Sequence, residues 1–268
     1  MRRAADPGEG VPKAMTGQAL VDHGRLLDVL GAEVERLTAA AREAAPDTPV
    51  PTTPGLTIGE VVRHLGGVYR VATGWMTEGR RPAGWQRDPA DGQSGEEYLR
   101  EGFAALHREL TSHDPAEYAA GWWPADRTYG FWCRRMAHET TVHRIDVQNA
   151  ANRIVTEVDE DVAIDGIDEI LALWFGQRLP MLGLSGTFTG SVGIRTGGHD
   201  WIARAGPGET VAWRCSAADT DRANGLVTGP PMAVYQWLWG RLGHGSVTWE
   251  RSEDSIGQFW ALLRLATK

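Results

Sequence analysis

The sequence has few cysteines and no long apolar run. Its 268 residues include 2 cysteines, Cys133 and Cys215, which are too few and too far apart for a disulfide framework. We interpret both as free thiols in a reducing compartment. About 18 consecutive apolar residues would be needed for a transmembrane helix, and no such run exists. The N-terminus also lacks the apolar segment of a signal peptide. We therefore expect a cytoplasmic protein with no membrane partner.

The sequence is equally short of concentrated positive charge. Lysine and arginine number 27 against 35 aspartates and glutamates, a formal net charge of -8. Basic residues occur in pairs such as Arg134 and Arg135 and form no extended run. Nucleic acid is therefore not expected as a partner. The length is sufficient for a sizeable core and indicates two domains.

The most informative segment is Phe131 to Ala150, which has the pattern of an amphipathic helix. Glu139 and His143 are four residues apart and therefore lie one above the other on one face. They occupy the stripe that Trp132 and Val147 mark as apolar. An unpartnered carboxylate buried there would be destabilising by several kcal/mol, so a shared cation is the simplest explanation.

A third ligand is offered by His64, in a helix that begins at the capping box of Thr57 and Glu60. Its apolar stripe includes Leu65 and Val68, and His64 falls within this stripe. If the two helices are neighbours, His64 joins the carboxylate and imidazole described above. Two histidines, one carboxylate and an open position are typical of a catalytic zinc site and also of a non-haem iron centre.

Tryptophan is abundant, with 12 residues against 5 phenylalanines and 5 tyrosines. Several lie in sequence near the candidate ligands, and they fill a core or line an apolar pocket. The residues of this group are Trp75, Trp85, Trp122, Trp123 and Trp132.

The distribution of apolar residues predicts an α+β protein. Residues 1–15 read as a flexible tail, and residues 16–154 contain four amphipathic helices, the third of which begins at a second capping box, Ser94 and Glu97. Four helices with inward-facing ligands indicate a four-helix bundle. Residues 155–268 predict a small α+β domain. It contains one helix in 158–179, antiparallel strands between 186 and 221, a helix closed by Gly243, a strand in 247–252 and a terminal helix.

Taken together, these segments resemble the mycothiol-dependent maleylpyruvate isomerase family. The resemblance rests on the segments EVVRHLGG, FWCRRMAHETTVHRID, DGIDE and GPPMAVYQWLWGRL. It implies a DinB-like four-helix bundle with His64, Glu139 and His143 as ligands of a divalent metal, zinc being the expected ion. It also implies mycothiol as the thiol cosubstrate.

The expected function is that of a zinc-dependent, mycothiol-using isomerase or thiol S-transferase, acting on a small electrophilic, unsaturated carboxylic substrate. Arg135 and Arg241 are the candidate catalytic residues, since a developing enolate needs a positive group. Arg241 also fits a helix-terminal arginine bonded to the last carbonyls. For Asp146 we favour a solvated acid at the helix end over an acceptor for His143. A non-catalytic metal- or ligand-binding protein and a non-haem iron enzyme remain as alternatives.

Overall fold

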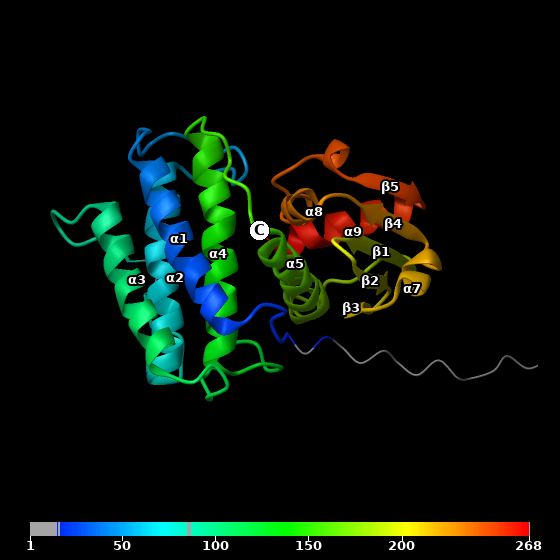
Figure 1. Cartoon of the computed structure of the whole chain (residues 1–268), viewed down its shortest axis with the longest axis horizontal. Helices are drawn as coiled ribbons and strands as arrows, with labels where there is room; N and C mark the ends of the chain where they lie inside the picture. The colour runs from blue at the N-terminus through cyan, green and yellow to red at the C-terminus, as the bar shows by residue number, and fades with distance from the viewer. Residues whose placement is uncertain (1–14, 16, 85–86, 268) are drawn as a thin grey trace, which may run out of the picture.

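A helical half and a mixed half lie side by side in the computed structural model (Figure 1). It describes residue 15 and residues 17–84 and 87–267. The tail proposed for residues 1–15 lies outside the described residues except for Met15, and so does Trp85. The helical bundle and the five-stranded sheet confirm the α+β class.

The helical half contains the four expected helices, and both predicted capping boxes are present at their N-termini. Thr57 and Glu60 exchange hydrogen bonds at the start of the second helix, and Ser94 and Glu97 do the same at the third. Gly79, with φ of 71°, ends the second helix in the left-handed conformation. The four helices are α1 (His23–Ala41), α2 (Ile58–Glu78), α3 (Gly95–Ser112) and α4 (Tyr129–Ala150).

Helix α4 is buried along almost its whole length. It packs on α1 and α2, and Figure 1 shows its other side facing the C-terminal half. Such a helix has no wide solvent face, so it carries its charged residues into the interior. The proposed domain boundary after residue 154 falls in the segment that follows α4 and precedes residue 160.

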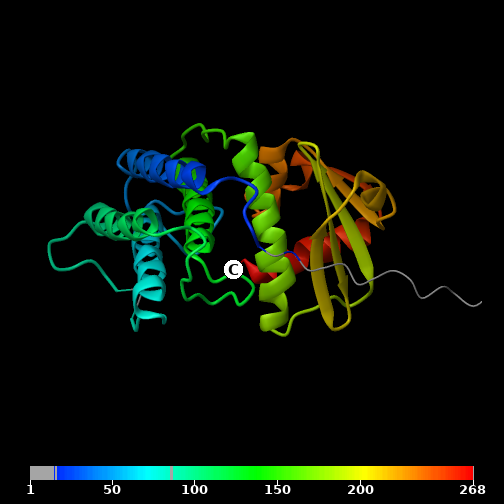
Figure 2. The ribbon, with the colours of Figure 1, turned by 60° about the horizontal axis from the view of Figure 1, so that its bottom comes forward.

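The first C-terminal helix changes its hydrogen-bonding pattern along its length. It begins as α5 (Glu160–Glu169), continues as a π-helix, η1 (Ile170–Arg178), and closes with α6 (Leu179–Met181). Figure 2 shows this continuous helix between the bundle and the sheet. The sequence predicts one helix here but not its π-helical part, a form that is rare and is frequent at functional sites.

The sheet is antiparallel apart from one pair. Its strand order is β3-β2-β1-β4-β5, and β1 and β4 run parallel. Five strands compose it: β1 (Gly190–Thr196), β2 (His199–Gly206), β3 (Glu209–Arg214), β4 (Gly225–Thr228) and β5 (Thr248–Arg251). The accompanying helices are α7 (Ala217–Asp221), α8 (Pro231–Leu238), η2 (His244–Ser246) and α9 (Glu253–Ala266).

Three details of this half differ from the sequence expectation. The stretch after Cys215 is the helix α7 rather than strand, because Ser216 and Asp219 form a capping box there. Strand β4 was not predicted. Helix α8 ends at Leu238 and not at Gly243, since Gly240 already adopts a φ of 71°.

A buried ion network joins the two halves. The Arg134 guanidinium donates to Asp165 and Asp168 of α5, and His138 Nε2 lies 2.7 Å from Asp165 Oδ2. Arg214 of β3 also bonds Asp168. The side chains of Arg134, Asp165 and Asp168 are at most 1% exposed, so each charge depends on its partners.

Within the described residues, no helix combines the length and apolarity needed to cross a membrane.

Candidate metal centre

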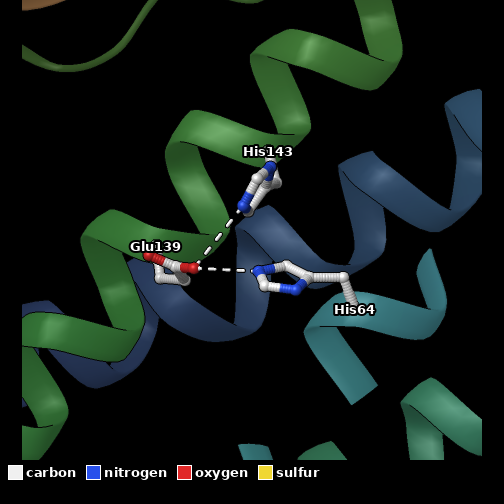
Figure 3. A group of neighbouring side chains, drawn as sticks. All are labelled: His64, Glu139 and His143. Atoms are coloured by element: carbon white, nitrogen blue, oxygen red, sulfur yellow. Dashed lines mark hydrogen bonds and ion pairs between the residues drawn. The ribbon is translucent and has the colours of Figure 1, made fainter. Parts of the chain in front are cut away.

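Three potential ligands meet between α2 and α4. Oε1 of Glu139 lies 3.4 Å from Nε2 of His64 and 3.5 Å from Nε2 of His143 (Figure 3). The donor atoms of all three lie within 4.8 Å of one another. The structure thus brings together the three residues that the sequence singled out as ligands.

The local sequence explains this convergence. Glu139 and His143 are one turn apart on α4, so their side chains project from the same face. His64 projects from the neighbouring α2, and its ring meets that of His143 edge-on, with centroids 5.1 Å apart. The helix packing that buries the apolar stripes therefore also assembles the ligand set.

The donor chemistry fits a divalent transition metal. Two imidazole nitrogens and one carboxylate oxygen point at a common volume, which is the composition of three-ligand catalytic zinc sites. The side chains are 26%, 18% and 11% exposed for His64, Glu139 and His143. This partial exposure leaves room for a further ligand to approach, whereas a fully enclosed site would exclude one.

The electrostatics of the site favour a cation. Burial alone would raise the pKa of Glu139, but hydrogen bonds from His143 and His64 and the charge of Arg135 outweigh it and hold that pKa well below its usual range. Glu139 is therefore an anion at neutral pH. Burial opposes the charged form of His143, yet Asp146 and Glu139 raise its pKa to about 9. A metal must displace that proton to bind the ring.

Asp146 contacts Nδ1 of His143, the ring nitrogen that does not approach Glu139. Its Oδ2 lies 3.1 Å from His143 Nδ1, and its Oδ1 accepts from the Thr52 hydroxyl at 2.6 Å. The interpretation of Asp146 as a solvated acid was wrong, because its side chain is 0% exposed. In the neutral ring this contact keeps the proton on His143 Nδ1, so Nε2 is the nitrogen that a metal can bind once it displaces the second proton.

The two candidate catalytic arginines lie in different positions relative to the ligands. Arg135 donates to Oε2 of Glu139 at 2.9 Å and also bonds Glu169. Arg241 forms a bidentate pair with Asp146, at 2.9 and 2.7 Å, and donates to the Trp239 carbonyl. Arg135 therefore touches a ligand directly, whereas Arg241 reaches His143 through Asp146. Their catalytic roles remain predictions.

A cavity of about 490 Å³ opens beside Glu139. Trp75, Trp122 and Trp132 line it, as the pocket interpretation predicted, while Trp123 is instead buried in the core. Two further lining residues, Trp174 and Arg178, belong to the π-helix and were not predicted from the sequence. The complete lining is Val68, Val71, Trp75, Arg81, Trp122, Trp132, Arg135, Met136, Glu139, Trp174, Arg178, Met181 and Ala266.

Comparisons with known proteins agree with this architecture. Residues 27–148 match the family described as the mycothiol maleylpyruvate isomerase N-terminal domain. A crystal structure of the mycothiol-dependent maleylpyruvate isomerase is 10% identical, with a TM-score of 0.59, and the match covers 86% of this chain and 93% of that chain. A histidine-to-alanine mutant of an enzyme of the same name is 11% identical, with a TM-score of 0.58 and the same coverage.

At these identities the solved structures establish a common fold. No curated protein matches the sequence. The family match spans α2 and α4 and thus includes all three residues of the candidate centre. Over residues 27–148 the sequence is thus similar to the mycothiol maleylpyruvate isomerase N-terminal domain, and the chain shares its fold with the solved structures of that name.

Proposed function

We propose that this protein is a metal-dependent enzyme that uses mycothiol to isomerise, or to form an S-conjugate with, a small unsaturated carboxylic electrophile. The observation that carries the proposal is the set of His64, Glu139 and His143, whose donor atoms lie within 4.8 Å of one another beside a cavity. The family match over residues 27–148 and the names of the similar structures support mycothiol as the thiol. Zinc is the metal we propose, because two histidines and one carboxylate beside an open position compose a catalytic zinc site.

The protein's own residues prepare the centre for this chemistry. Asp146 fixes the tautomer of His143, and Arg241 and Thr52 fix Asp146 in turn. Glu139 is kept ionised by its partners, so it is ready to bind a cation. A bound zinc ion would hold the thiol sulfur as a thiolate at neutral pH, the form that adds to unsaturated carbonyl compounds.

We assign to Arg135 the positive charge that a developing enolate oxygen needs. Arg135 lines the cavity next to Glu139, and its guanidinium is held over the Trp174 ring, 5.6 Å from the centroid. A fixed, buried guanidinium stabilises a developing oxyanion more strongly than a mobile one in solvent. Arg241 contributes through Asp146, as a residue that positions His143.

Cobalt substitution tests the thiol chemistry without knowledge of the electrophile. The candidate ligands are nitrogen and oxygen atoms, so the cobalt(II) protein should show no sulfur-to-metal charge transfer on its own. Titration with mycothiol should create a near-ultraviolet charge-transfer band and release protons. Simple alkyl thiols should produce the band only at higher concentration. The His143→Ala variant, loaded in the same way, is the matched control and should show no band.

The same experiment separates the alternatives. If the cobalt site is filled and no thiol changes the spectrum, both the isomerase and the S-transferase proposals fail. Oxygen consumption by the ferrous protein would then identify a non-haem iron enzyme, which uses the same two-histidine, one-carboxylate composition. A silent spectrum without oxygen consumption would favour a metal-binding protein that performs no turnover.

The role of Asp146 can be tested by the substitution Asp146→Asn. The amide cannot accept from His143 and Arg241 as strongly as the carboxylate does, so zinc affinity should fall by about 10–100-fold. Competition with a chromophoric chelator measures the change. Asp159→Asn, at an exposed ion pair with Arg25, is the control and should leave the affinity unaltered. Equal affinities of the wild type and the Asp146→Asn variant would contradict an orienting role for Asp146.

A further inference from the structure

The continuous helix from α5 to α6 carries side chains of increasing exposure, three of which, Trp174, Arg178 and Met181, line the cavity. Glu169, which bonds Arg135, is 1% exposed, and Met181 at the other end is 51% exposed. Trp174 and Arg178 lie between them, at intervals of about one π-helical turn, and both are half-buried. The π-helix therefore places one indole and one guanidinium in the wall of the cavity that Glu139 also lines.

Arg178 differs from Arg135, the cavity arginine whose bonds are described above. Arg135 is paired with both Glu139 and Glu169. No hydrogen bond or ion pair to the Arg178 guanidinium occurs within the described part of the chain, and its Nε is buried without an acceptor. A buried guanidinium donor left without a partner is destabilising unless a ligand supplies the acceptor.

A second donor in the same wall lacks an acceptor. Trp174 Nε1 is buried and has no hydrogen-bond acceptor. Among the described tryptophans with a buried, unpaired indole N–H, Trp174 is the one that lines this cavity. Two orphan donors four residues apart on one helix can be satisfied together by a ligand rich in oxygen atoms. The fork of a guanidinium matches a carboxylate in particular, since it binds both oxygens at once.

The charge of the cavity selects an anion over a neutral ligand. Its lining contains three arginines, Arg81, Arg135 and Arg178, and a single carboxylate, Glu139. A bound metal would add further positive charge. Glu139 and Glu169 compensate much of the charge of Arg135, so Arg178 is the main attraction for an anion. A carboxylate gains from this charge, whereas neutral sugar hydroxyls gain little.

We infer that Arg178 and Trp174 form the subsite that binds the carboxylate of the electrophilic substrate and so determine specificity for acidic electrophiles. The inference rests on the proposed function for the identity of the second reactant. The apolar walls of Trp122 and Trp132 then enclose the remainder of the substrate between this subsite and Glu139. Arg178 is in this view a binding residue and takes no part in activating the thiol.

Calorimetric titration with succinate, a dicarboxylate that does not react with thiols, tests the inference on the zinc-loaded full chain. Arg178→Gln should weaken succinate binding by about 10-fold to 100-fold, the range for a lost hydrogen bond to a charged group. Arg178→Lys should restore part of the affinity. Arg222→Gln, which removes an exposed arginine paired with Asp219, should bind like the wild type. Succinamide should bind weakly and equally to all four proteins.

Two further measurements keep this test separate from that of the proposed function. Succinate affinity should still depend on Arg178 after zinc is removed, because the carboxylate binds the protein and not the metal. The thiol-induced cobalt band should be unchanged in Arg178→Gln. Absence of succinate binding by the wild type, equal binding by Arg178→Gln, or complete loss of binding on metal removal would overturn the inference. Arg178-dependent binding in a protein without a thiol band would uphold it while the proposed function fails.

Discussion

Replacing His143 with alanine should leave the purified protein with almost no tightly bound metal. Loss of a group that merely orients a ligand lowers metal affinity by about 10–100-fold, and loss of a ligand itself should exceed that range. Two remaining protein ligands hold zinc poorly. His64→Ala and Glu139→Ala should behave in the same way. Elemental analysis of each variant after dialysis against a weak chelator measures the metal content per chain.

A histidine outside the centre provides the control for this experiment. His107 lies on α3 and contacts Phe103, so His107→Ala should retain the metal content of the wild type. Melting temperatures of the metal-free proteins show whether each variant folds. A full complement of metal in the folded His143→Ala variant would refute the assignment of His64, Glu139 and His143 as a metal site. Unaltered metal content with a lowered melting temperature would instead identify them as core residues.

The ligand set was predictable from sequence because its determinants are local. The four-residue spacing of Glu139 and His143 defines a shared helix face before any tertiary structure is known. His64 follows a capping box that fixes the start of α2, so the face it occupies can also be read from the sequence. The packing of α2 against α4 was the one non-local assumption, and the bundle confirms it.

The surroundings of the site depend on contacts that are distant in sequence. Asp146 was misinterpreted because its partners Thr52 and Arg241 are 94 and 95 residues away. Trp174 and Arg178 lie in an apolar helix, and we recognise no sequence pattern that marks where its hydrogen bonding becomes π-helical. Strand β4 is four residues long and pairs in parallel with β1, so neither its length nor its pattern marked it in advance.

The substitution with the largest expected effect on stability is Asp165→Asn. Asp165 accepts from Arg134 and lies 2.7 Å from His138 Nε2, and its side chain is 0% exposed. The introduced amide carries no charge to neutralise the arginine. Its NH2 group would also face the hydrogen-bond donors of Arg134 or His138. Removal of one partner from a buried ion pair is destabilising by about 3–5 kcal/mol. Urea unfolding at pH 7 should show this as a lower transition midpoint with an unchanged m-value.

The pH dependence of that difference identifies its cause. Burial raises the pKa of Asp165, but the charge of Arg134 and the hydrogen bond from His138 outweigh it and hold the pKa below its usual range. Stability from a depressed carboxyl pKa is fully present above the unfolded value, about 3.9, and is lost as pH falls through the folded value. The unfolding free energies of wild type and Asp165→Asn should therefore differ most at neutral pH and converge below about pH 4.

Asp161→Asn, at an exposed pair with Arg25, should change stability by less than about 1 kcal/mol. A difference for Asp165→Asn that stays constant from neutral to acidic pH would show that lost packing, and not the buried charge pair between the two halves, is responsible.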